Sequence, residues 1–263
     1  MLAYILSNCA FVFLYSFVVK QYERPLLTIY TQLSFMNILI FFGRSPFNDI
    51  TFTRKDVITS FLYTFMFFSG MKIIQYGDIN NYISHHGIAL LYFIYELSTK
   101  LTITNILKIW IIMVVASIGI YSINVSVWSF VWTISYILLL RSRRYVDNKC
   151  DYIFKVTSIP LPLLFLLTFL IEDPLVIDEH EYATLVVSSL LFGTLSTISF
   201  YFFISNYKST ILATLGYISV FMSIVLNVVI NGEEDYFFVK LFAFATTCLL
   251  FFFKLSTTTI FST

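Results

Sequence analysis

The residue types best suited to binding a solute lie in one short stretch of an otherwise apolar segment. The stretch NNYISHHGIALLYF (80–93) begins with two asparagines and contains Tyr82 and the adjacent histidines His85 and His86. An imidazole titrates near neutral pH and can donate or accept hydrogen bonds, so it could bind an anion in a pH-sensitive way. Lys72, ten residues before Tyr82, adds a cation. These side chains form the first candidate for a binding site.

The two histidines are poorly spaced for a metal. Adjacent residues project about 100° apart on a helix, so His85 and His86 cannot easily face the same ligand. Metal-binding histidines on a helix are typically three or four residues apart, and the remaining histidine, His180, lies in an acidic stretch. We therefore expect no resident metal or cofactor. We expect one histidine to face a polar cavity and the other to pack against, or hydrogen-bond with, a neighbouring helix.

Other kinds of site have no signature in this sequence. No Gly-rich phosphate loop, GxSxG elbow or HExxH motif occurs, so we do not expect an enzyme. No nucleic-acid-binding pattern occurs either. The three cysteines, Cys9, Cys150 and Cys248, are scattered, and this spacing favours packing roles over disulfides or zinc binding.

The composition is that of an integral membrane protein. Of the 263 residues, 59% are hydrophobic and only 12% are charged, whereas a soluble domain has about 25% charged residues. Little of the chain is left for a soluble domain. We therefore expect one transmembrane domain over 1–263.

A membrane-spanning helix needs about 20 apolar residues, fewer when it is packed among others. The chain offers about ten such segments. The first has no basic residue before its apolar run and no small-x-small cleavage pattern after it, which favours a retained helix over a signal peptide. Pro160 and Pro162 should kink or break the seventh segment. The ten segments are 1–19, 25–43, 56–76, 81–98, 104–123, 125–141, 152–171, 183–204, 209–230 and 236–254.

The distribution of charge predicts the orientation. With ten spans both termini lie on one side, and the loops on that side hold eleven of the 16 basic residues. The opposite loops hold only Lys20 and Arg24, together with the acidic stretches 172–181 and 232–235. Because positive residues concentrate in cytoplasmic loops, we expect both termini in the cytosol.

Five spans before residue 124 and five after it suggest two halves. An odd number of spans in each half inverts the second half relative to the first, as in many secondary transporters that bind their ligand between the halves. We expect repeats over about 1–123 and 124–254. Ten spans without a repeat are the alternative.

Several other polar residues within the spans have a structural interpretation. Lys108 and Lys240 lie near span ends, where their side chains could extend to the membrane surface. Glu96 lies four residues before Lys100 and could form an ion pair with it. In the eighth span, small residues recur every fourth position at Ser189, Gly193 and Thr197. This spacing favours close helix approach, with a hydroxyl-lined cavity wall as the alternative.

The stretch KIIQYGDINNYISHHGIAL (72–90) resembles the pattern around the third and fourth helices of nucleotide-sugar transporters. Its lysine, its Gln-Tyr pair and Tyr82 fall into register without a gap. The later segments VWSFVWTISYILLLRSRR (127–144), DYIFKVTSIPLPLLFL (151–166) and VVSSLLFGTLSTISFYFFISNYKSTILATLG (186–216) are similar to later helices of the same family. The resemblance is to the GDP-mannose transporter type, within the drug/metabolite transporter superfamily.

The resemblance implies an all-α membrane protein of ten helices in two inverted five-helix repeats. It also implies where substrate would bind. The family's FYNN motif falls on 154–157, where Thr157 is the remaining polar group, and its GALNK motif falls on 216–220, where Gly216 is kept. His86 stands where the family has a lysine, with Lys72 and Lys155 as further cations. The expected substrate-binding residues are Tyr82, His86, Lys72, Thr157, Thr197, Gly216, Tyr217 and Ser219.

The function that the resemblance implies is transport in the Golgi or endoplasmic reticulum membrane, with both termini cytosolic. The carrier would exchange a nucleotide sugar such as GDP-mannose for a nucleoside monophosphate by alternating access, and a homodimer is left open. One alternative is a drug/metabolite-type transporter of another solute, such as a sugar phosphate, a nucleoside or an amine. The other is a membrane scaffold that transports nothing.

Overall fold

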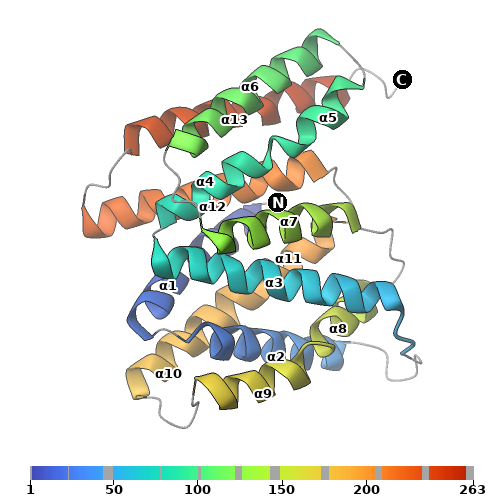
Figure 1. The fold of residues 1–263 in the computed structure, drawn as a ribbon, viewed down its shortest axis with the longest axis vertical. Coiled ribbons are helices and arrows are strands. Elements are labelled where there is room, and N and C mark those ends of the chain that lie inside the picture. Colours follow the sequence, from blue (N-terminus) through green and yellow to red (C-terminus); the bar gives the residue numbers. More distant parts are fainter. Residues whose placement is uncertain are drawn as a thin grey trace.

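A computed structural model shows the arrangement of the chain (Figure 1). It describes residues 2–22, 24–43, 50–77, 79–99, 102–121, 126–142, 149–172, 178–204, 209–232 and 237–258. Within these ranges every regular element is a helix. The helices are α1 (Leu2–Tyr22), α2 (Pro25–Gly43), α3 (Arg54–Tyr76), α4 (Ile79–Ala89), α5 (Tyr92–Ser98), α6 (Ile103–Tyr121), α7 (Val127–Ser142), α8 (Lys149–Ser158), α9 (Leu161–Ile171), α10 (Glu179–Val186), the π-helix η1 (Val187–Gly193), α11 (Thr194–Ile204), α12 (Ser209–Asn231) and α13 (Phe237–Thr258).

The protein is a multi-pass membrane protein by the length and composition of its helices. Within the described residues, six helical stretches are long and apolar enough to cross a bilayer. They are Pro25–Gly43, Arg54–Tyr76, Ile103–Ile120, Cys150–Ile171, Glu179–Ser199 and Ala213–Ile230. Three shorter apolar helices are Tyr4–Ser16, Val127–Leu140 and Phe237–Leu249. Each of the ten segments that the sequence singled out contains helix.

Local chemistry explains where particular helices begin and end. α3 begins at a capping box, in which the Asp56 N–H donates to Thr53 Oγ1 (3.3 Å) and the Thr53 N–H donates to Asp56 Oδ2 (2.9 Å). α12 ends before Gly232, whose φ of 100° favours glycine. Both signals can be read in the sequence.

Two of the predicted spans are interrupted. Between α8 and α9 the helix breaks at Ile159 and Pro160, as the prolines predicted. Between α4 and α5 the chain tightens at Leu90 and Leu91, whose N–H groups bond to carbonyls three residues earlier. This second break has no proline, and the sequence did not predict it.

A π-helical stretch interrupts the eighth span at η1. The Thr194 N–H donates to the Ser189 carbonyl five residues earlier, which is the π-helical pattern. Gly193, at the end of η1, is so closely packed that an added Cβ would lie 2.9 Å from Phe11 Cε2 and 2.8 Å from Gln32 Cδ. The close helix approach that the small residues predicted is therefore confirmed.

The helices stack in tiers that each combine early and late parts of the chain (Figure 1). α6 packs with α13 at the top of the view, and α4 packs with α12 beneath them. α2 packs with α8 and α9 at the bottom. Between these tiers lie α1, α3, α7 and α11, which occupy the centre of the molecule.

The central helices form two bundles. In the first, which we call the α1 bundle, α1 packs against α12 and along α10, η1 and α11. In the second, the α3 bundle, α3 packs along α7, and α4 packs against both. The two bundles meet where α1 contacts α3 and where α4 contacts α12.

One expectation about charged side chains is wrong. Lys240 is only 2% exposed and therefore does not extend its ammonium group to the membrane surface, because α13 buries it against the rest of the molecule. The Lys108 side chain is partly exposed, and its extension to the membrane surface stays a prediction. The side chain of Glu96 and the whole of Lys100 lie outside the described residues, so their ion pair stays a prediction.

Candidate functional site

A cavity of about 70 Å³ lies between the two bundles. The α1 bundle contributes side chains from α1 and α11, and the α3 bundle contributes side chains from α3, α4 and α7. A buried water needs about 10–15 Å³, so the space would hold a few water molecules. The lining residues are Tyr4, Asn8, Phe11, Val12, Tyr63, Met66, Phe67, Tyr82, His86, Trp132, Tyr136, Ser196 and Thr197.

His86 is the cavity residue with the most unused hydrogen-bonding capacity. It is 5% exposed, and neither ring nitrogen has a hydrogen-bond partner among the described residues. A buried polar atom without a partner typically costs about 1–3 kcal/mol. His85, in contrast, is not among the lining residues, and its Nδ1 lies 2.6 Å from the Asn81 carbonyl of its own helix. The structure therefore places one histidine at the cavity and the other in packing, as expected.

Three aromatic rings contact the His86 imidazole. Its ring centre lies 4.5 Å from Trp132, 4.9 Å from Tyr82 and 5.4 Å from Tyr136. Trp132 and Tyr136 stack nearly parallel, one turn apart on α7, with ring centres 4.8 Å apart. Such a wall offers flat π faces to a planar ligand.

The opposite wall carries amide and hydroxyl groups. On α1, Asn8 Nδ2 donates to Ser219 Oγ, while Ser196 Oγ donates to Asn8 Oδ1 (2.9 Å). Thr197 Oγ1 accepts from Gln32 Nε2 (2.9 Å) and lies 2.8 Å from Tyr63 OH. The Tyr63–Thr197 hydrogen bond joins the α3 bundle to the α1 bundle across the cavity wall.

The described lining residues include no lysine, arginine, aspartate or glutamate. Lys72, which the sequence placed among the candidate ligands, lies elsewhere. Its Nζ donates to Gln75 Oε1 (2.7 Å) and lies 5.7 Å and 5.4 Å from the ring centres of Phe68 and Tyr76. The structure therefore does not bring Lys72 together with His86 and Tyr82.

The remaining predicted ligands form a second layer around the cavity or lie apart from it. Gly216 lies behind His86, since an added Cβ would be 3.4 Å from the imidazole, and Ser219 is bonded to Asn8. Tyr217 is buried against Gly87. Thr157 is fully buried and accepts from the Asn37 amide (3.0 Å), away from the cavity lining.

Sequence reasoning missed much of the cavity. Asn8 and Gln32 are amides in the middle of apolar spans, and that contrast is a signal that the sequence offered. Tyr63, Trp132 and Tyr136 give no such signal, because the chain has 18 tyrosines and three tryptophans in similar contexts. Among the residues that the structure describes, no three metal-ligating side chains come together.

No protein-family model matches the chain, and no curated protein matches it at a significant level.

Proposed function

We propose that the protein is a solute transporter of the drug/metabolite type that works by alternating access. The observation that supports this best is the position of the cavity, which lies between two bundles and receives side chains from both. A cavity in this place becomes accessible from one side or the other when the bundles rock against each other. A scaffold would have no need for a cavity lined by a buried histidine whose two ring nitrogens have no hydrogen-bond partner among the described residues.

The packing supports two inverted repeats. An inverted repeat would pair α1 with α7, α2 with α8–α9, α3 with α10–α11, α4–α5 with α12, and α6 with α13. Exchanging the members of each pair converts the α1 bundle into the α3 bundle. Three of the pairs, α2 with α8–α9, α4 with α12 and α6 with α13, pack directly against each other, as elements around a two-fold axis do. Ten spans without a repeat would not predict this correspondence.

The substrate class that we propose is a nucleotide sugar, exchanged for a nucleoside monophosphate. Tyr82, Trp132 and Tyr136 would stack on the base, whereas His86 and Asn8 would hydrogen-bond to sugar and phosphate oxygens. Pockets for ligands of this size usually measure about 300–1,000 Å³, so the bundles must separate to admit the substrate. With both termini cytosolic, this exchange would supply the lumen of the Golgi or endoplasmic reticulum.

A second candidate is a solute without a phosphate, such as a nucleoside or an amine. The observation that favours it is the cavity lining, where the described residues include no lysine or arginine to pair with a diphosphate. The aromatic wall suits a base through stacking, or an amine through cation–π contact. The two candidates differ in whether phosphate adds to affinity or weakens it.

Ligand-dependent thermal stability of the purified protein tests both candidates. A ligand at a hundred times its Kd stabilises the folded state by about 2.7 kcal/mol. We expect a nucleotide sugar and its nucleoside monophosphate to raise the Tm, and the shift should disappear in His86→Leu. His85→Leu is the matched control, because His85 is equally buried but does not line the cavity. A shift with nucleosides or amines alone would support the second candidate, and no shift with any member of the panel would refute both.

A further inference from the structure

Three aromatic rings pack together at one end of the cavity. The Phe11 ring, on α1, stacks on the Phe67 ring of α3 with centres 5.5 Å apart and an interplanar angle of 14°. Tyr15, one turn further along α1, lies 4.9 Å from Phe11 and 6.0 Å from Phe67. The rings belong to different bundles, so their contact holds the α1 bundle against the α3 bundle.

The rings lie between the cavity and one end of the helices. Phe11 and Phe67 line the cavity, but Tyr15 does not, although it is only 3% exposed. Tyr15 interacts electrostatically with Glu172, which follows the last residue of α9. The order from the cavity outwards is therefore the Phe11–Phe67 pair, then Tyr15, and then the ends of α1 and α9.

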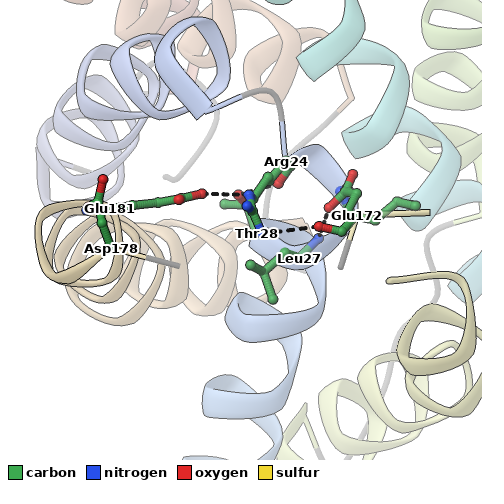
Figure 2. Close-up of polar contacts among 7 residues, drawn as sticks. Arg24, Leu27, Thr28, Glu172, Asp178 and Glu181 are labelled. Carbon is green, nitrogen blue, oxygen red and sulfur yellow. Dashed lines mark hydrogen bonds and ion pairs between the residues drawn. The ribbon is translucent and has the colours of Figure 1, made fainter. Parts of the chain in front are cut away.

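A cluster of charged groups fixes the α1 side of this closure (Figure 2). Arg24, between α1 and α2, places Nε 2.9 Å from Glu181 Oε1 on α10 and donates from Nη1 to the Glu172 carbonyl (3.0 Å). The two Glu172 carboxylate oxygens accept the N–H groups of Leu26 (2.8 Å) and Leu27 (2.7 Å) at the start of α2. The cluster therefore ties the α1–α2 corner to α9 and α10, so that these segments move together.

The contacts across the bundle boundary are of a different kind. Phe67 stacks on Phe11 and meets Tyr15 at a tilt of 59°, and one turn away Tyr63 forms a neutral hydrogen bond with Thr197. Parting the rings and this hydrogen bond leaves no ion unpaired. The charge that α3 contributes nearby is Lys72, which acts electrostatically on Glu172, and it keeps its hydrogen bond to Gln75 of its own helix when α3 moves. The boundary that can open is therefore the one between α3 and α1.

We propose that Phe11, Tyr15 and Phe67 form a gate that closes the cavity at the Arg24 end, and that separation of α3 from α1 opens it. The physiological role of this gate rests on the proposed transport function, since it presumes that a solute enters the cavity. The closure itself does not depend on the identity of that solute. In the proposed orientation the gate faces the lumen.

The accessibility of a cysteine in the cavity tests the gate without any substrate. Val12 lines the cavity and is 5% exposed. Val12→Cys, in the full chain with Cys9, Cys150 and Cys248 replaced by alanine, would react with a polar maleimide only when the cavity opens. Adding Phe67→Ala should increase the labelling rate at least tenfold in detergent micelles.

Two controls separate opening of the gate from general loosening. Phe65→Ala removes the same side chain from the outer face of α3, where it is 52% exposed, and should leave labelling unchanged. Phe221→Ala removes a ring that is 1% exposed and stacked on Phe244, away from the cavity lining, so it reports the effect of a core defect elsewhere. The gate proposal would be overturned if Phe67→Ala were labelled at the same rate as Phe221→Ala, or at the same rate as the parent. This conclusion would hold whatever the protein transports.

A second variant locks the gate. Phe11→Cys/Phe67→Cys, with the native cysteines replaced, can be joined by a short bifunctional thiol reagent that reduction cleaves. We expect joining to abolish solute exchange and reduction to restore it. Full exchange by the joined protein would contradict the proposal. If the proposed transport function were wrong but the gate were right, the parent protein would show no exchange, whereas Phe67→Ala would still be labelled fast.

Discussion

Gly193→Ala offers a quantitative test of the helix crossing behind the cavity. The new Cβ would lie 2.8 Å from Gln32 Cδ and 2.9 Å from Phe11 Cε2, closer than side chains normally approach. Gln32 cannot simply turn away, because its Nε2 donates both to the Gly193 carbonyl and to Thr197 Oγ1. The substitution therefore forces apart α1, α2 and η1, or breaks these hydrogen bonds.

The expected cost follows from three terms. Overpacking of this kind costs about 1–3 kcal/mol. Replacing a helical glycine with alanine returns about 0.8–1.0 kcal/mol, and losing one Gln32 hydrogen bond costs about 1 kcal/mol. The last two terms nearly cancel, which leaves a net destabilisation of about 1–3 kcal/mol.

Unfolding of the purified protein in detergent, by heat or denaturant, measures this cost. Gly43→Ala is the matched control, because Gly43 ends α2 with no atom within 4 Å of an added Cβ. By the same helix-propensity term, we expect Gly43→Ala to be neutral or to stabilise the protein by up to about 1 kcal/mol. A Gly193→Ala variant as stable as the parent would refute the close crossing of α1, α2 and η1, and with it the placement of Thr197 in the cavity wall.

Three further predictions concern the Arg24 cluster and the bundle boundary. Arg24→Ala leaves Glu181, which is 4% exposed, without its ion pair and should lower the unfolding free energy by about 3 kcal/mol. The control Arg54→Ala, at the exposed start of α3, should change the unfolding free energy little. Burial raises the pKa of the Glu172 carboxyl above its ordinary value of 4.5. This effect outweighs the hydrogen bonds from backbone N–H groups and the nearby charges of Lys72 and Arg24, which lower that pKa. The folded state then binds more protons than the unfolded state, so the contribution of Glu172 to stability is complete below pH 4.5 and is lost as the pH rises through the folded pKa. As the pH rises from 4.5 to neutral, the Tm of Glu172→Gln should therefore increase relative to that of the parent. A Tm difference that does not change with pH would contradict this prediction. Tyr63→Phe removes the hydrogen bond between the bundles and should lower the unfolding free energy by about 1 kcal/mol.

The sequence predicted the arrangement of helices better than their irregularities. Apolar length located helix in all ten segments, and Pro160 located the break between α8 and α9 because proline removes a hydrogen-bond donor. The break at Leu90 and the π-helix before Thr194 could not be predicted in this way. They depend on how neighbouring helices pack, and apolar composition carries no information about that.

The candidate site was predicted in part. His86, Tyr82 and Thr197, which the sequence proposed as ligands, line one cavity, and their role in binding substrate stays a prediction. Lys72 does not line this cavity, because its side chain extends to Gln75, and its position along the span gave no direction for that side chain. The aromatic wall was missed because rings that line a cavity and rings that face lipid have the same composition.

Counterflow in proteoliposomes tests the central claim most directly. Vesicles loaded with a nucleoside monophosphate or with an unlabelled nucleotide sugar would be diluted into a trace of labelled nucleotide sugar. We predict uptake that depends on the internal solute and that His86→Leu abolishes while His85→Leu retains it. Folded protein that gives no solute-dependent uptake, with nucleotide sugars, nucleosides or amines as the labelled solute, would contradict the account.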